Sequence, residues 1–167
     1  MYLVIFDCDG TLVDSQETIL HGLEVGFDAA GLEMPDRRTA LSIVGLSLER
    51  AFLTLVGEKN AGHVTKMADA YRASKVARRQ QGLDFDPLYP GTREVLDRLT
   101  ERDDILLGIA TGKARRGVDA VLAAHGLTGR FASIQTADDA PSKPHPGMIL
   151  NAMAETGAEP QNTVVVG

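Results

Sequence analysis

The sequence has one cysteine, no tryptophan, few aromatic residues and no long uncharged apolar run. A single cysteine cannot form an internal disulfide, so nothing indicates an oxidising compartment. The apolar run at residues 2–6 is too short for a secretion signal, and no later stretch approaches the ~18 apolar residues of a membrane span. Basic residues are also scarce: 17 Lys and Arg against 23 Asp and Glu give a net charge of −6. A nucleic-acid partner needs a clustered basic face. We therefore expect a soluble, cytoplasmic protein that binds neither membranes nor nucleic acid.

The composition is that of an ordinary globular chain. Hydrophobic residues make up 44% and charged residues 24% of the 167 residues. A chain of this length buries roughly 70% of the surface that it exposes when unfolded. The sequence therefore supports a real hydrophobic core, although it carries no signal for an oligomeric state.

Short apolar runs alternate with segments of helical periodicity. The run at 2–6 is short enough to be a strand buried on both faces, and comparable runs return at 105–110 and 163–166, with a weaker one at 132–135. Apolar residues recur at helical spacing between these runs, at 95–99, 118–122 and 148–153. This order predicts an α/β fold with a Rossmann-like parallel sheet.

A long stretch after the first predicted strand contains no convincing strand. Its apolar residues indicate helices around 19–27, 48–55 and 64–79. We interpret residues 15–86 as an inserted helical cap over the carboxyl end of the first strand, and residues 1–14 and 87–167 as the core. The alternative is a set of extra packing helices with no functional role.

Two aspartates follow the first predicted strand directly. In an extended chain, Asp7 and Asp9 point the same way while the Cys8 side chain points elsewhere. Open α/β sheets bind ligands in the crevice beyond the carboxyl ends of their strands, which is where these aspartates are expected. Two neighbouring carboxylates repel one another, and Mg²⁺ would relieve this because it prefers oxygen ligands and often bridges a carboxylate to a substrate phosphate. Gly10 permits a sharp turn that lets backbone amides approach an anion.

Residues 7–15, Asp-Cys-Asp-Gly-Thr-Leu-Val-Asp-Ser, resemble the first motif of the haloacid dehalogenase superfamily. The likeness is to its phosphoglycolate phosphatase-like and β-phosphoglucomutase-like branch. It implies that Asp7 is a phosphoryl-accepting nucleophile, that Asp9 is a general acid and base, and that both contribute to a Mg²⁺ site.

Further segments resemble the second and third motifs of this superfamily. Thr111 ends the second predicted strand, where its hydroxyl and the amide of Gly112 could donate to a phosphate oxygen. Lys143 lies in a proline-rich loop before a predicted helix, and its ammonium could balance the charge of a carboxylate and a phosphoryl group. The resemblance assigns Asp7, Asp9, Thr111 and Lys143 to catalysis. The adjacent His145 is interpreted as an exposed loop residue.

The fourth motif of the superfamily consists of aspartates after the glycine of an apolar strand. Residues 163–167 resemble that strand and glycine, and the given sequence stops there. We therefore expect a core that is truncated at the C-terminus and a metal site that lacks those acidic ligands.

The resemblance implies a Mg²⁺-dependent phosphatase that hydrolyses a small phosphorylated metabolite, similar to phosphoglycolate, through an aspartyl-phosphate. Alternatives are a phosphomutase of the β-phosphoglucomutase type, a pyrophosphatase and a non-catalytic phosphate-binding module; a dehalogenase is disfavoured because it has no need of Asp9. A loop at 43–47 resembles the family's substrate loop, the alternative being a plain turn between helices. The expected phosphate-binding positions are Cys8, Gly10, Thr11, Gly112 and Lys113, and the expected substrate-loop positions are Gly45, Leu46 and Ser47.

Overall fold

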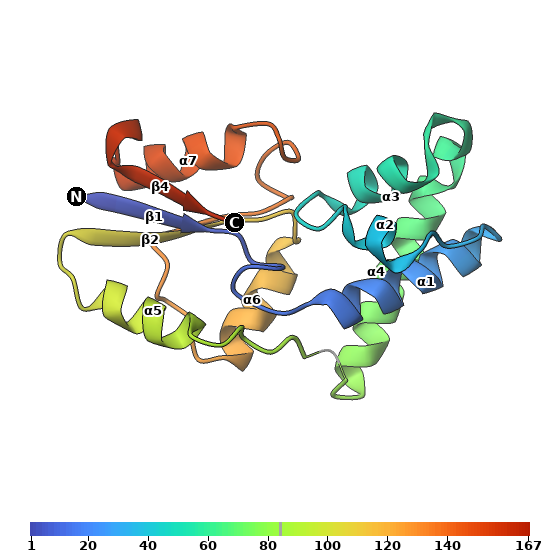
Figure 1. The fold of residues 1–167 in the computed structure, drawn as a ribbon, viewed down its shortest axis with the longest axis horizontal. Helices are drawn as coiled ribbons and strands as arrows, with labels where there is room; N and C mark the ends of the chain where they lie inside the picture. The colour runs from blue at the N-terminus through green and yellow to red at the C-terminus, as the bar shows by residue number, and fades with distance from the viewer. Residues whose placement is uncertain (84) are drawn as a thin grey trace.

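The computed structural model describes residues 1–83 and 85–167 and contains a parallel sheet of four strands in the order β3-β2-β1-β4 (Figure 1). The strands are β1 (Tyr2–Phe6), β2 (Ile105–Ala110), β3 (Ser133–Gln135) and β4 (Thr163–Val166). Each coincides with a predicted apolar run to within one residue. The predicted α/β fold with a parallel, Rossmann-like sheet is confirmed.

Helices cover the sheet on both faces. On one face, α5 (Thr92–Thr100) and α6 (Arg115–Ala124) bury Leu96 and Leu122 against Phe6 and Ile109. On the other, α7 (Gly147–Thr156) buries Met148 and Ala152 against Leu3 and Ile5. Alternate residues of β1 thus enter opposite layers, because successive side chains of a strand point to opposite faces. A turn of 3₁₀ helix, η2 (Pro160–Asn162), leads into β4.

The regular elements between β1 and α5 are all helices in the part that the structure describes, as predicted. They are α1 (Gln16–Ala30), α2 (Arg37–Leu41), α3 (Leu48–Val56), the 3₁₀ segment η1 (Glu58–His63) and α4 (Val64–Gln80). These elements, here called the helical block, lie to one side of the carboxyl ends of the strands (Figure 1). They have their own apolar cluster, which includes Leu23, Phe52 and Met67. Two glycines of α1 permit the close packing: a Cβ on Gly26 would lie 2.5 Å from Phe52 Cζ, and one on Gly22 would lie 2.4 Å from Tyr71 Cε2.

Two chain segments connect the helical block to the sheet, and they are hydrogen-bonded to each other. The amide of Asp14 donates to the carbonyl of Pro87 at 2.8 Å, and the amide of Tyr89 donates to the carbonyl of Leu12 at 3.1 Å. Val13 forms an antiparallel bridge with Leu88 between them. The chain therefore leaves the core and returns to it at one place, here called the neck (residues 12–14 and 87–89).

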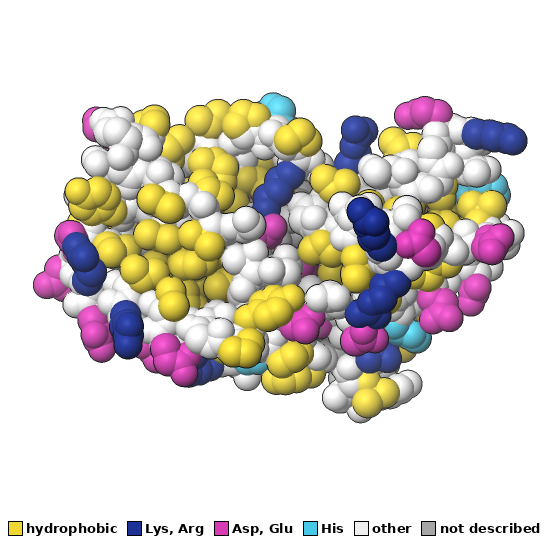
Figure 2. All heavy atoms as spheres, in the orientation of Figure 1, with side chains coloured by type: hydrophobic (Ala, Val, Ile, Leu, Met, Phe, Trp, Pro, Cys, Tyr) yellow, Lys and Arg dark blue, Asp and Glu magenta, His cyan; other side chains and the backbone are white. Residues whose placement is uncertain are grey.

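Two features differ from the sequence predictions. The first is the burial of β4, whose Val164 and Val165 are each 55% exposed. Figure 2 shows hydrophobic side chains gathered on the sheet half of the molecule. The short helix α2 was not predicted, because five residues are too few to show helical periodicity. It begins after Asp36, whose side chain accepts from the amides of Arg38 and Thr39. In the described part of the chain, no helix is both long and apolar enough to cross a membrane.

Candidate active site

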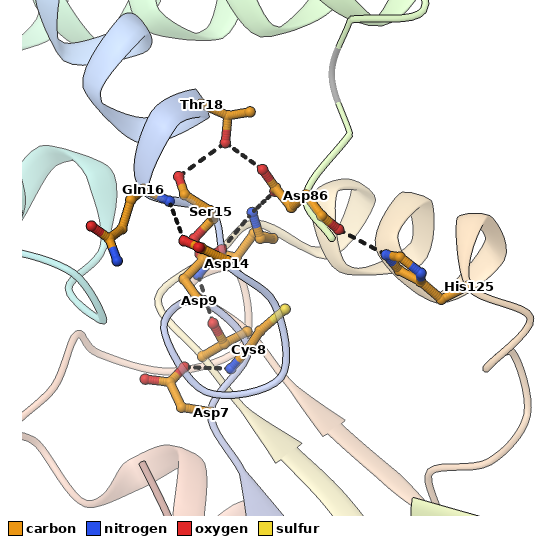
Figure 3. A network of polar contacts seen from close by, with 11 residues as sticks. Asp7, Cys8, Asp9, Asp14, Ser15, Gln16, Thr18, Asp86 and His125 are labelled. Carbon is orange, nitrogen blue, oxygen red and sulfur yellow. Dashed lines mark hydrogen bonds and ion pairs between the residues drawn. The ribbon is translucent and has the colours of Figure 1, made fainter. Parts of the chain in front are cut away.

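Asp7 and Asp9 lie in a tight loop at the carboxyl end of β1. Gly10 has a φ of +81°, in the left-handed region that favours glycine, and its amide donates to the carbonyl of Val13 at 3.0 Å. The Asp7 carboxylate accepts from the amide of Cys8 at 2.7 Å. Figure 3 shows the Cys8 thiol pointing away from that carboxylate, as predicted. Burial raises the pKa of this thiol, and the negative charge of Asp9 adds to the effect. Cys8 is therefore an inert, protonated part of the core.

Each of the two carboxylates is paired with its own lysine, and the two lysines come from different loops. Lys143 Nζ lies 2.7 Å from Asp7 Oδ2, and Lys113 Nζ lies 2.9 Å from Asp9 Oδ1. Lys143 is in the loop before α7, and Lys113 is in the loop between β2 and α6. The fold thus places positive charge beside both aspartates, which offsets their mutual repulsion.

Lys113 lies between two buried carboxylates. Its side chain is 13% exposed, and its Nζ is also 3.8 Å from Asp86 Oδ2. Burial by itself disfavours the charged form, but the nearby charges of Asp9 and Asp86 outweigh it, so the pKa of Lys113 is raised above 10.5. The ammonium is therefore charged at neutral pH, and it contacts Asp9 in this structure.

Asp86 belongs to this cluster although sequence reasoning gave it no role. It follows α4 in the returning segment, and its side chain is 6% exposed. Its carboxylate accepts from the Thr18 hydroxyl at 2.5 Å, and its backbone carbonyl lies 2.8 Å from His125 Nε2 (Figure 3). Asp86 therefore joins α1, α6 and the loop after β2 at one point. No local sequence signal marks it, because it is separated from Asp9 by the whole helical block.

Thr111 and Gly112 follow β2 and lie next to the same loop. Thr111 is fully buried, and its hydroxyl accepts from the amide of Lys113 at 3.2 Å. A Cβ on Gly112 would lie only 2.2 Å from the carbonyl oxygen of Leu46. Only glycine allows the backbone of the helical block to approach this closely.

The predicted substrate loop is the connection between α2 and α3. A Cβ on Gly45 would lie 3.3 Å from Asp7 Oδ2, so this residue lies directly beside that carboxylate. The amide of Ser47 donates to the Ser142 hydroxyl at 2.9 Å, next to Lys143. Gly45, Leu46 and Ser47 thus touch the loops that carry Asp7, Gly112 and Lys143.

The amides predicted to bind phosphate have acceptors within their own loop. The Cys8 amide bonds to Asp7, the Gly10 amide to Val13, and the Thr11 amide donates to the Cys8 carbonyl at 3.3 Å. His145 is exposed, and its Nδ1 accepts from the amide of Gly147. The fold therefore gathers Asp7, Asp9, Lys113 and Lys143, and leaves His145 on the surface.

The oxygen donors at the end of β1 suit a hard cation. The carboxylates of Asp7 and Asp9 are 13% and 12% exposed, so both retain some access to solvent. The described residues contain no group of three or more His, Cys, Asp or Glu side chains that could hold a metal. Because Mg²⁺ commonly takes only one or two carboxylates and keeps several waters or phosphate oxygens, the two aspartates fit it as a partial ligand set.

Comparison with known proteins gives consistent results. The family model of haloacid dehalogenase-like hydrolases matches residues 4–167. The chain is 36% identical over 171 residues to the protein named "Probable phosphatase IndB" of Dickeya dadantii, covering 99% of this chain and 72% of that protein. It is 33% identical over 153 residues to a phosphoglycolate phosphatase of Rhodobacter capsulatus, covering 89% and 68%.

A solved structure extends the likeness to the fold. The haloacid dehalogenase-like hydrolase from Bacteroides fragilis superposes with a TM-score of 0.85 and 24% identity, covering 99% of this chain and 78% of that one. The predicted family resemblance is therefore confirmed. From the match over nearly the whole sequence and from these relatives, we conclude that the chain belongs to the haloacid dehalogenase-like hydrolases.

Proposed function

We propose that this protein is a phosphatase that hydrolyses a small phosphorylated metabolite through a phosphoryl group carried on Asp7. The observation that carries the proposal is the pair of aspartates at the end of β1, each matched with a lysine, at 2.7 Å for Asp7 and 2.9 Å for Asp9. A phosphatase of Rhodobacter capsulatus named for phosphoglycolate is among the relatives, which supports a substrate of that kind. The single cysteine accords with action in the cytoplasm.

In the first step, a carboxylate oxygen of Asp7 attacks phosphorus while the bond from phosphorus to the ester oxygen breaks. Asp9 enters this step in its protonated form and gives that proton to the leaving oxygen, so the alcohol departs neutral. In the second step, Asp9 takes a proton from a water whose oxygen attacks the same phosphorus. The Asp7–phosphorus bond then breaks, which releases phosphate and restores both carboxyl groups to their starting states.

The remaining residues offset negative charge and position the phosphoryl group. Lys143 offsets the negative charge of Asp7 and of the transferring phosphoryl group as a point charge. The Thr111 hydroxyl and the Gly112 amide orient the phosphoryl oxygens. Mg²⁺, held by Asp7 and Asp9, would supply further neutralisation of phosphoryl charge.

We also propose that the helical block, residues 15–86, is a cap that closes over the site. The loop at Gly45 and Leu46 supports this, because it lies against both Asp7 and Gly112. A seated cap limits the access of water and contacts the leaving group, and its withdrawal admits the substrate.

The test is phosphate release from phosphoglycolate by the wild-type chain, with Mg²⁺ and with EDTA. Asp7→Asn should lower kcat by about a thousandfold or more, because the nucleophile is lost. Asp28→Asn, an exposed aspartate of α1, is the matched control and should be unchanged. Mass spectrometry of quenched wild-type protein should show one added phosphoryl group, absent in Asp7→Asn.

Three outcomes would contradict the proposal. Near-normal turnover by Asp7→Asn would refute the assignment of Asp7 as the nucleophile. Transfer of the phosphoryl group to a second sugar hydroxyl rather than to water would identify a phosphomutase. Absence of turnover on every phosphate ester and on pyrophosphate would identify a binding module.

A further inference from the structure

A large cavity lies between the helical block and the core. Its volume is about 920 Å³, and it is lined by residues of α1, α4 and α6, the segment at Phe85 and Asp86, and the loop at Gly45. At one end it reaches Asp9 and Lys113, which places it on the side where the leaving group of a phosphate ester would lie. The function proposed above does not account for its size.

The large volume is not caused by displacement of the helical block from the core. The Leu46 carbonyl is packed against Gly112, and the Ser47 amide is hydrogen-bonded to Ser142. On the neck side, Asp86 is held by Thr18 and lies within ion-pair distance of Lys113. The helical block is thus seated on the core on both sides of the cavity.

Glycolate is much too small for this space. At roughly 30 Å³ per water, the cavity of about 920 Å³ would hold on the order of 30 waters. Sites for drug-sized ligands range from about 300 to 1,000 Å³. A two-carbon leaving group would leave most of the cavity to solvent, whereas a group with a sugar and a ring system would fill a substantial part of it.

The walls present aromatic and apolar surface. Phe85 lines the cavity and is 54% exposed, and its ring packs 5.0 Å from the ring of His125, which also lines it. Tyr71 of α4 lines the cavity too, with its ring fixed against Gly22 and edge-on to Phe52. Val121 of α6 adds aliphatic surface. Aromatic faces of this kind bind planar rings by stacking.

Basic side chains line the cavity together with acidic ones such as Asp86 and Asp119. Lys75 and Arg79 of α4 and Arg116 of α6 line it, in a protein whose net charge is −6. Basic groups in such a wall suit the polar or anionic edge of a bound ring.

We propose that this cavity binds a leaving group of nucleoside size, with a planar ring stacked on Phe85, so that the preferred substrate is a nucleoside monophosphate rather than phosphoglycolate. This inference rests on the proposed phosphatase function. It assigns Phe85 to substrate specificity, a role that the motif residues do not cover.

The test compares phosphoglycolate, ribose 5-phosphate and AMP, three primary phosphate esters whose leaving groups increase in size. The value of kcat/KM should rise along this series, with AMP about tenfold above ribose 5-phosphate because of base stacking. Phe85→Ala should remove that AMP preference. Leu150→Ala, an exposed residue of α7 outside the cavity, is the matched control and should keep it.

Calorimetric titration with AMP provides a readout that does not depend on turnover. AMP should bind to the wild-type chain and about tenfold more weakly to Phe85→Ala. If all three esters are hydrolysed without a preference for AMP, the leaving-group inference is wrong and the phosphatase function stands. If none is hydrolysed, the phosphatase function fails. In that case AMP binding weakened by Phe85→Ala still supports the cavity assignment, and absence of binding overturns it.

Discussion

Replacing Lys113 with methionine tests whether its ammonium holds the buried carboxylates together. Methionine keeps an unbranched side chain of similar length and removes the charge. Lys113 Nζ lies 2.9 Å from Asp9 and 3.8 Å from Asp86, and the three side chains are 13%, 12% and 6% exposed. Without the ammonium, two carboxylates would face each other in a site with little water. The folded state should therefore lose much of its stability.

The size of the loss follows from this burial. Removing one partner of a buried ion pair costs about 3–5 kcal/mol. The Thr18 hydroxyl continues to donate to Asp86, and Asp9 keeps some solvent access. We therefore expect Lys113→Met to lower the free energy of unfolding by an amount near the lower end of this range, about 3 kcal/mol. For a chain of this length that corresponds to a fall in Tm of about 6–12 °C.

The assay is urea and thermal denaturation followed by circular dichroism at pH 7. Lys66→Met, an exposed position on α4, is the control and should change the free energy of unfolding by less than about 0.5 kcal/mol. Asp86→Asn combined with Lys113→Met should be more stable than the sum of the single losses predicts, by about 1 kcal/mol or more. A loss for Lys113→Met no larger than that for Lys66→Met would refute the argument that its charge holds this cluster.

Two further perturbations test the packing of the helical block. Gly112→Ala places a Cβ 2.2 Å from the Leu46 carbonyl and should displace the loop at 43–47, so that hydrogen exchange of the Ser47 amide speeds up by about tenfold or more. Gly62→Ala meets no atom within 4 Å and serves as its control; equal exchange in the two variants would contradict the close contact. Burial raises the pKa of Glu49, but its hydrogen bond to Arg72, a backbone hydrogen bond and the charge of Arg72 together outweigh burial and hold the pKa below its ordinary value of 4.5. The contribution of the charged Glu49 to the stability of the folded state is therefore present above pH 4.5 and is lost as the pH falls through the lowered pKa. Glu49→Gln should cost about 0.5 kcal/mol at pH 7, since both side chains are half exposed, and the difference should shrink in acid; a difference independent of pH would show that the charge of Glu49 is irrelevant.

Much of the fold could be predicted because its signals are local. Strands such as β1 and β2 are uninterrupted apolar runs, and α1 and α3 end at Gly31 and Gly57, each with a positive φ. The short helix α2 (Arg37–Leu41) could not be predicted, because five residues are too few to show helical periodicity.

Only the site residues that belong to contiguous sequence motifs could be predicted. Asp7 and Asp9 lie two residues apart after a strand, and the structure places Lys143 against the first of them. For Lys113, sequence reasoning assigned the position to phosphate binding, while the structure turns its ammonium to Asp9. The role of Asp86 depends on contacts with residues far away in the sequence, which no spacing rule reveals.

The neck has a consequence for how such a protein could have arisen. Asp14 and Pro87 are joined by a hydrogen bond of 2.8 Å although the whole helical block separates them in the sequence. Excising the block and joining these ends would not require any strand of the sheet to change its place or direction. A gene for the bare sheet could therefore gain the block, or exchange it for another, in one insertion, and substrate range could change while the aspartates at the end of β1 stayed where they are.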